Sequence, residues 1–510
     1  MAVKVVLLIV FFAVMVAVGI YARKHAASVD GFVLGGRQAG PWLTAFAYGT
    51  SYFSAVVFVG YAGQFGWKYG IASTWIGLGN AFIGSLLAWV VLGRRTRVMS
   101  QHLGSKTMPD FFGERFESKA LKITASAIVF IFLVPYTASV YNGLSRLFGM
   151  AFNIPYTACV IGMAVFTGVY VILGGYMATA INDFIQGIIM LGGIVAVIAA
   201  VLSGQGGFIE AIRKMAEIPS DVPATLGQQG AFTSFFGPDP LNLLGVVILT
   251  SLGTWGLPQM IHKFYAIKDE RSINTGTVIS TFFAIVISGG CYFLGGFGRL
   301  FDDPSLYDAS GNMIYDGIIP YMLSTLPDIL IGVVVVLVLS ASMSTLSSLV
   351  LTSSSTLTLD FLKGNIIKNM GEKKQVVTMQ ILVVFFIVLS VVLAINPPAF
   401  IAQLMGISWG ALAGAFLAPF LYGLYWKGVT RAAVWASFIC GVGITVSNMY
   451  LKYIASPINA GAIAMIAGLI VVPIVSLVTP KMAKKKTDEI FACYEETVVI
   501  SKKRALETGK

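Results

Sequence analysis

The chain has 510 residues, of which 57% are hydrophobic and only 11% are charged. Soluble domains carry about 25% charged residues, so this composition argues against a soluble protein and indicates a polytopic membrane protein. The net charge of +11 does not require nucleic acid, because the basic residues fall in loops between apolar segments. The four cysteines show neither a disulfide framework nor the spacing of a metal site.

Thirteen apolar segments approach the roughly 20 residues that span a bilayer. The first is too long for the core of a signal peptide and is followed by Arg23 and Lys24, so we expect a retained span. The segment 317–355 is too long for one plain span, and part of it is expected in the interface or in an extracellular loop. The segments fall at about 3–22, 41–65, 71–93, 121–148, 155–175, 183–203, 241–262, 273–299, 317–355, 375–395, 398–425, 432–452 and 460–479.

Every second loop is basic, which by the positive-inside rule places the N-terminus outside and the C-terminus in the cytoplasm. The loop after 241–262 is one of these, with Lys263, Lys268 and Arg271 assigned to it. All three histidines (His25, His102 and His262) are likewise expected in or beside cytoplasmic loops.

Two segments carry signals of an interrupted helix, and they lie five spans apart. Segment 41–65 has Gly49 followed by hydroxyl residues, and segment 241–262 has Gly253, Gly256 and Pro258. The alternative for each is a packing glycine or a proline kink, which are common in membrane helices. Their matching positions favour an all-α inverted repeat of five plus five helices with broken first helices, because transporters hold ions and substrate at such breaks.

This repeat divides the chain into six expected parts. They are an N-terminal extra helix with a cytoplasmic loop (1–40), the first repeat (41–203), an extracellular loop (204–240), the second repeat (241–425), two C-terminal helices (426–480) and a basic cytoplasmic tail (481–510). The chain has no glycine-rich phosphate loop followed by Lys-Ser/Thr, so ATP-driven transport has no support.

A dense run of hydroxyl residues lies within segment 317–355, at 340–348. Positions three and four apart share a helix face, so Ala341, Ser344, Thr345 and Ser348 form one stripe, with Ser347 beside it. Such a stripe offers uncharged oxygens to a hard cation such as Na+. The alternative is that these hydroxyls bond the preceding turn of their own helix or pack against a neighbour.

Asp183 is the main acidic residue near an apolar segment. It is interpreted either as the N-cap of segment 183–203 or as an ion ligand within the membrane. No buried pair of carboxylates is evident, so sodium coordinated by neutral oxygens is favoured over a dedicated proton relay.

Five stretches together carry a family resemblance over about residues 5–480. They are Leu34-Gly35-Gly36-Arg37, Gly174-Gly175-Tyr176 with Asn182-Asp183 and Gln186, Gly256-Leu257-Pro258, Met343-Ser344-Thr345-Leu346-Ser347, and Gly423-Leu424-Tyr425-Trp426-Lys427 with Thr430-Arg431. On these residues the chain resembles the sodium/solute symporter family, which includes bacterial proline, pantothenate, galactose and sialic acid symporters. The resemblance implies the inverted-repeat fold of the amino-acid/sodium transporters and inward co-transport with Na+ by alternating access.

The resemblance also implies where ions bind. The common sodium site would use the carbonyls of Thr50, Phe53 and Ala341 and the hydroxyls of Ser344 and Thr345. A second sodium, which some members hold, would fall on Asp183, Ser344, Ser347 and Ser348.

The sequence says less about the identity of the solute than about the ion. The resemblance places its site among Ser51, Ser54, Gln64, Asn80, Tyr136, Thr254, Trp255 and Ser408. Tyr136 matches a tyrosine of the proline symporter, but Tyr52 and Thr254 stand where that symporter has Asp and Tyr. The stretches Tyr69-Gly70, Asn182-Asp183 and Gly256-Leu257-Pro258 look closer to the pantothenate type. Trp255 is as readily a packing aromatic as a gate.

We therefore expect a sodium-coupled symporter in the cell membrane that imports an amino acid such as proline or a small carboxylate such as pantothenate. Its expected partners are Na+, the solute and the bilayer, with neither ATP nor nucleic acid. The alternatives are a solute sensor or a channel on a transporter fold, but no signalling domain or selectivity-filter motif supports them. An enzyme is not expected, because no nucleophile–base or metal-ligand arrangement falls within the spans.

Overall fold

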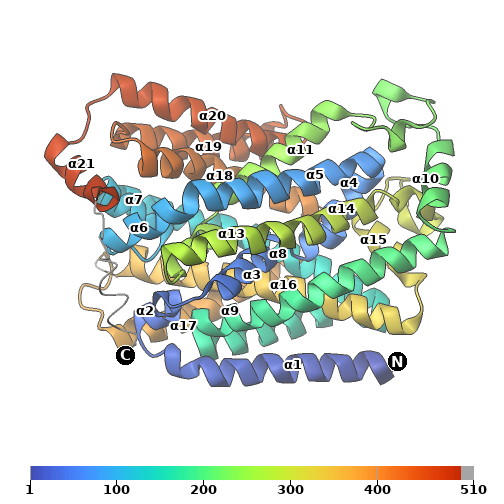
Figure 1. The fold of residues 1–510 in the computed structure, drawn as a ribbon, viewed down its shortest axis with the longest axis horizontal. Helices are drawn as coiled ribbons and strands as arrows, with labels where there is room; N and C mark the ends of the chain where they lie inside the picture. Colours follow the sequence, from blue (N-terminus) through green and yellow to red (C-terminus); the bar gives the residue numbers. More distant parts are fainter. Residues whose placement is uncertain (1, 364, 399, 496–510) are drawn as a thin grey trace, which may run out of the picture.

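The computed structural model describes residues 2–363, 365–398 and 400–495. Its helices run nearly parallel to one another and form a bundle (Figure 1). Within the described residues, ten helical stretches are long and apolar enough to cross a membrane, or eleven when the bent pair 240–256 and 258–266 counts as one span. Two of the ten, at 56–102 and 156–204, contain a glycine of positive φ, Gly70 (φ 60°) and Gly175 (φ 52°). Divided at these glycines, the stretches give the thirteen expected segments.

The glycine at 70 is required by the packing as well as by its backbone angle. A Cβ there would lie 2.1 Å from the carbonyl oxygen of Phe232, in the segment that connects α9 to α11. At Gly175 the backbone (φ 52°, ψ −148°) again leaves the region open to L side chains, and the helix direction changes.

The first half of the bundle contains two helices that are not continuous α-helices. The first broken helix consists of α3 and then a π-helical turn (η3) that leads into α4. The next is mixed, with α5 and two π-helical stretches (η5 and η6) before α6. The elements are α1 (Ala2–Ala22), α2 (Val29–Leu34), α3 (Pro41–Tyr52), η3 (Val56–Tyr61), α4 (Ala62–Tyr69), α5 (Thr74–Gly79), η5 (Asn80–Leu87), η6 (Trp89–Gly93), α6 (Arg94–His102), α7 (Met108–Arg115), α8 (Lys119–Phe152) and α9 (Tyr156–Gly204).

The second half begins after a connecting segment that carries α10 (Phe208–Glu217). Its elements are α11 (Pro240–Leu252), η9 (Gly253–Gly256), α12 (Pro258–Ala266), α13 (Glu270–Ala284), α14 (Gly290–Gly295), α15 (Ile318–Ser324), α16 (Asp328–Thr356), η14 (Leu357–Leu362), α17 (Glu372–Ile395), α18 (Ile401–Tyr425), α19 (Arg431–Leu451), α20 (Pro457–Val478) and α21 (Lys484–Phe491). Segment 317–355 is thus divided, with α15 as a separate short helix and α16 as the span.

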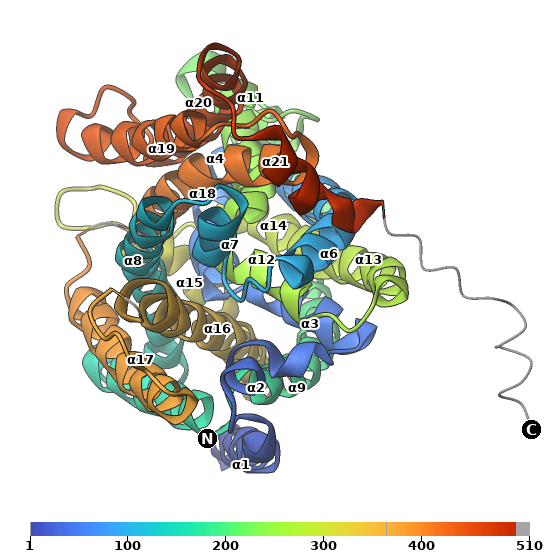
Figure 2. The same ribbon diagram turned by 90° about the vertical axis from the view of Figure 1, so that its left-hand side faces the viewer.

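Helix α16 lies inside the bundle, where α3, α8, α9, α12 and α17 surround it (Figure 2). Its apolar window is 78% buried, against 22% for α1, which packs on the outside of the bundle. The hydroxyl run of α16 is therefore turned toward protein rather than lipid. A polar stripe in this position needs internal hydrogen bonds or a ligand, since hydrocarbon offers it no partners.

The start of α1 and the C-terminal helix α21 lie at opposite ends of the bundle, on the right and left of Figure 1. The left end also carries α2, α6 and α7. These helices and the loops beside them contain many of the basic residues on which the predicted orientation rests. The arrangement agrees with an odd number of spans.

Candidate functional site

The first helix break lies between α3 and η3. Helix α3 ends at Tyr52, Phe53 takes an extended conformation (φ −110°, ψ 95°), and helical structure resumes near Val56. The Ser54 hydroxyl accepts a hydrogen bond from the Val56 N–H at 3.2 Å and so begins the second half. The last carbonyls of α3 have lost their usual helical donors and are left to bond other partners.

Those partners are two hydroxyls of α16. The Ser344 hydroxyl lies 2.9 Å from the Thr50 carbonyl oxygen and 3.1 Å from that of Ala341. The Thr345 hydroxyl lies 3.3 Å from the carbonyl oxygens of both Thr50 and Ser51, and 3.1 Å from that of Ala341. All five residues are buried.

This cluster contains more acceptors than protons. Three carbonyl oxygens and two hydroxyl oxygens converge on two hydroxyl protons, and of the three carbonyls only that of Ala341 also accepts a helical N–H, from Thr345. Neutral oxygens in excess of donors suit a hard cation, which would bind the carbonyls and the hydroxyl lone pairs together.

Four of the five predicted sodium ligands, namely Thr50, Ala341, Ser344 and Thr345, come together here, and the Ser51 carbonyl joins them. Phe53 lies at the break itself, and no hydrogen bond among the described residues joins its carbonyl to the group.

The residues predicted for a second sodium lie one turn further along α16. Ser347 donates to the Ser344 carbonyl at 2.9 Å, while the Ser348 hydroxyl lies 2.8 Å from that of Ser51. Asp183 projects from α9 toward the same region. An ammonium group lies between them: Lys263 Nζ is 2.9 Å from Ser348 Oγ and 3.6 Å from an Asp183 carboxylate oxygen.

Two placements from the sequence were wrong here. Lys263 was assigned to a cytoplasmic loop and His262 to a position in or beside it, but both are buried in α12, which continues to Ala266. Lys263 is tolerated inside the bundle because Asp183 and Ser348 pair with it. Asp183 is not an N-cap: it lies about two turns into the half-helix that begins after Gly175, with its side chain 1% exposed.

The second break separates α11 from α12, and the two halves are bent by 46°. Gly253–Gly256 forms a tight 3-10 turn, Leu257 is extended (φ −87°, ψ 121°), and Pro258 begins α12. Proline fits the first turn of a helix, where its missing N–H costs nothing.

The polar groups of the second break bond the backbone of the π-helical stretch η5. The Thr254 hydroxyl reaches the Gly84 carbonyl at 3.1 Å, and the Trp255 indole N–H reaches that of Ile83 at 3.0 Å. A π-turn frees carbonyls in this way. Asn80 extends the same network, since its amide contacts the hydroxyls of Ser251 (3.2 Å) and Ser288 (3.1 Å).

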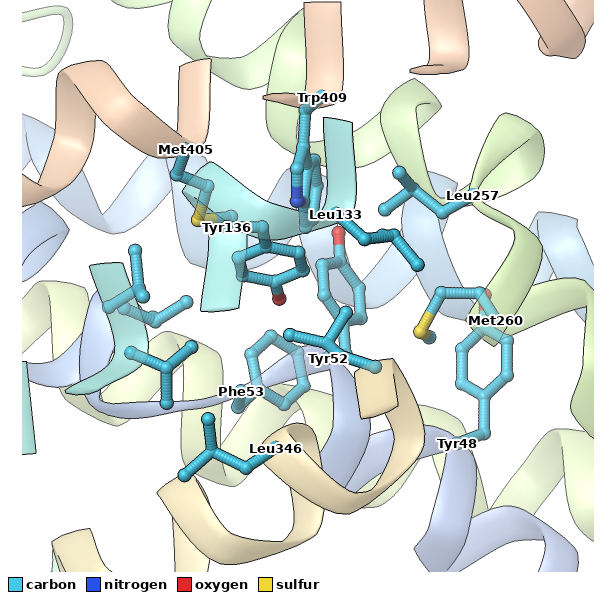
Figure 3. Packing of buried hydrophobic residues seen from close by; sticks show 14 of the residues in the cluster. Tyr48, Tyr52, Phe53, Leu133, Tyr136, Leu257, Met260, Leu346, Met405 and Trp409 are labelled. Atoms are coloured by element: carbon cyan, nitrogen blue, oxygen red, sulfur yellow. The ribbon is translucent and has the colours of Figure 1, made fainter. Parts of the chain in front are cut away.

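An aromatic group surrounds the first break, where Tyr52, Tyr136 and Trp409 gather near Phe53 (Figure 3). Tyr52 stacks on Phe53 with ring centroids 4.3 Å apart, and Tyr136 packs edge-on against Trp409 at 5.9 Å. Ser408, beside Trp409, donates to the Phe132 carbonyl at 2.5 Å.

Two buried polar atoms of this aromatic group have no hydrogen-bond partner among the described residues, the Tyr136 hydroxyl and the Trp409 indole nitrogen. The side-chain oxygen of Gln64, in α4, is also unpaired there. Unpaired buried donors and acceptors are costly, so they point to a ligand that would satisfy them.

The predicted solute residues therefore divide among several places. Ser51 faces the ion side and Ser54 serves as a helix cap, whereas Asn80, Thr254 and Trp255 belong to the second break. Only Tyr136 and Gln64 retain free polar atoms. Trp409 was missed by the sequence reasoning, although its position directly after the chosen Ser408 was an available signal.

Comparisons with known proteins agree with this arrangement. The family model described as "Sodium:solute symporter family" matches residues 32–441 of this chain. A sodium/proline symporter of Staphylococcus aureus (strain JH9) is 29% identical over 509 residues, covering 94% of this chain and 93% of the relative.

Solved structures share the fold at lower identity. One is a Na+-coupled sialic acid symporter in a substrate-bound outward-open state, which matches with a TM-score of 0.74 and 15% identity over 94% of this chain and 99% of that one. Another is MhsT in complex with L-phenylalanine, with a TM-score of 0.52 and 16% identity over 86% of this chain and 99% of that one. These likenesses bear on the fold alone.

Proposed function

The chain belongs to the sodium:solute symporter family, and from that premise we propose that it imports a small amino acid or carboxylate by binding Na+ at the first helix break. Thr50, Ala341, Ser344 and Thr345 hold the ion, together with the Ser51 carbonyl. The predicted Phe53 carbonyl completes the set when the break adjusts around the ion.

One observation carries this proposal: the two α16 hydroxyls meet the released carbonyls of α3. An ion at this point binds the broken helix to the central helix of the bundle. Solute binding next to the break then benefits from the ordered backbone, and by linkage Na+ and solute raise each other's affinity by the same factor.

The solute side is supported by the unpaired polar atoms of Tyr136 and Trp409 in the aromatic group, and by the unpaired side-chain oxygen of Gln64 in α4. We infer a small solute with an apolar body and a few hydrogen-bonding groups. Proline is the first candidate because the Staphylococcus aureus relative is a sodium/proline symporter. Pantothenate is the second, since Tyr52 and Thr254 depart from the pattern of the proline type.

The basic end of the bundle is proposed to face the cytoplasm, with α1 beginning outside. The repeats are proposed to comprise 41–203 and 241–425, so that each begins with one of the two broken helices.

A thermal-shift screen of the purified protein tests the proposal. Proline, other amino acids, monocarboxylates, pantothenate and sugars are added in NaCl or in KCl. A coupled solute at about 100 times its Kd should stabilise the fold by about 2.7 kcal/mol in NaCl and much less in KCl. An equal shift in both salts would contradict sodium coupling.

A further inference from the structure

The ammonium of Lys263 occupies the place where Asp183 and Ser348 converge. Its nitrogen is 2.9 Å from the Ser348 hydroxyl and 3.6 Å from Asp183, and both side chains of the ion pair are almost fully buried, at 2% and 1% exposure. The ring of Tyr176 lies 5.4 Å from the same nitrogen and contributes its negative face.

Asp183 gains its compensating charge from this lysine. Neither of its carboxylate oxygens has a hydrogen-bond partner among the described residues, so Lys263 at 3.6 Å is the nearest described counter-charge. A carboxylate buried in a membrane bundle needs a cation, either a side chain or an ion.

A sodium ion bound to both Asp183 and Ser348 would lie within a few ångströms of the ammonium nitrogen. Two positive charges at such a distance repel strongly in a buried site. The Ser348 hydroxyl is also already hydrogen-bonded to Lys263 and to Ser51. The ammonium and a second sodium therefore compete for the same place.

The lysine is also connected to the first break. Lys263 belongs to α12, the second half of one broken helix, and reaches Ser51 of α3, in the other, through the Ser348 hydroxyl of α16. The Ser51 carbonyl in turn accepts from Thr345 in the candidate sodium cluster. A positive charge at this point thus links both broken helices to the central helix.

We propose that Lys263 is a tethered cation that stands in place of a second sodium, so that this protein binds a single Na+ in each cycle. The inference rests on the proposed sodium function of the Ser344–Thr345 cluster. It assigns Asp183 to the lysine and not to an ion.

The test counts bound sodium on the purified full-length protein, using 22Na+ at saturation and no solute. The wild type should bind one ion and Lys263→Gln two, because removing the ammonium opens the place beside Asp183. Lys263→Arg, which keeps the positive charge, is the control and should bind one.

If Lys263→Gln does not fold, the wild-type count decides the question, and Asp183→Asn/Lys263→Gln, which removes both charges, shows whether an ion was held at Asp183. The inference expects one ion for the wild type and one for the double variant. A sodium at Asp183 instead requires two ions in the wild type, falling to one in the double variant. A folded Lys263→Gln that still binds one ion would also overturn the inference.

The two proposals fail in different ways. A wild type that binds no sodium contradicts the proposed function itself. A wild type that binds two, one of them lost in Thr345→Val, upholds that function and refutes only the tethered cation.

Discussion

The two helix breaks have similar positions in the two halves of the bundle, but their polar groups are used differently. At the first break, carbonyls of Thr50 and Ser51 face two hydroxyls of α16. At the second, Thr254 and Trp255 donate to carbonyls of η5. At the second break the broken helix supplies the donors, whereas at the first it supplies carbonyl acceptors that converge with two hydroxyls. An interrupted helix is therefore not enough to make an ion site. The groups that a neighbouring helix places opposite the break determine whether an ion can bind there.

The largest effect should come from removing Asp183, the counter-charge of Lys263, which lies in α12 just after the second break. Asp183→Asn leaves the Lys263 ammonium buried without a counter-charge, and breaking a buried ion pair from one side costs about 3–5 kcal/mol. We expect a marked fall in the thermal midpoint of the purified protein. Asp183→Asn/Lys263→Gln should recover most of it, and a double variant as unstable as the single one would contradict the pairing.

The next effect concerns the first break alone. Thr345→Val keeps the side-chain shape but removes a hydroxyl that lies within 3.3 Å of three carbonyl oxygens. The loss of a buried polar ligand costs about 1–3 kcal/mol, which corresponds to roughly a 5- to 150-fold higher Na+ concentration for half-maximal uptake. Uptake of the solute identified by the screen, measured across Na+ concentrations, gives the value. An unchanged Na+ dependence would remove Thr345 from the site.

We expect added side-chain volume at the second break to lower the stability of the fold without changing the Na+ dependence of uptake. A Cβ added at Gly256 would lie 2.8 Å from the Ala413 Cα and the Leu417 nitrogen, both backbone atoms of α18. Gly256→Ala should therefore destabilise the fold by about 1–3 kcal/mol through overpacking. Gly443→Ala, where nothing lies within 4 Å, is the matched control and should leave the thermal midpoint unchanged or slightly raised.

The smallest effect is the counterpart of Thr345→Val at the other break. Thr254→Val removes hydrogen bonds to Gly84 and Ser251, worth about 0.5–1.5 kcal/mol of stability. The Na+ concentration for half-maximal uptake should stay at the wild-type value. A shift as large as that of Thr345→Val would mean that both breaks bind the ion.

Much of this fold was predictable because hydropathy and break signals are local. Segment lengths near 20 residues predicted the spans, and Gly253, Gly256 and Pro258 marked the bent helix where the structure has it. The spacing of Ala341, Ser344 and Thr345 correctly placed them on one face, since helical periodicity requires no knowledge of neighbours.

The contacts between segments were not predictable in the same way. Lys263 follows an apolar segment, so charge alone placed it in a loop; only the approach of α9 and α16 to α12 explains its burial. The π-helical stretch at η5 and the role of Trp409 likewise depend on tertiary packing. Pairing across 80 to 300 residues leaves no trace in the periodicity of a single chain.

Sodium-dependent thermal stabilisation, measured without solute, tests the central claim most directly when two neighbouring serines are compared. Ser344 crosses to the Thr50 carbonyl, whereas the equally buried Ser342 donates to the Val338 carbonyl of its own helix at 2.7 Å. Ser342→Ala should keep the wild-type dependence of the thermal midpoint on Na+, and Ser344→Ala should need about tenfold more Na+ for the same shift. Identical Na+ dependence in the wild type and both variants would contradict an ion at the first break.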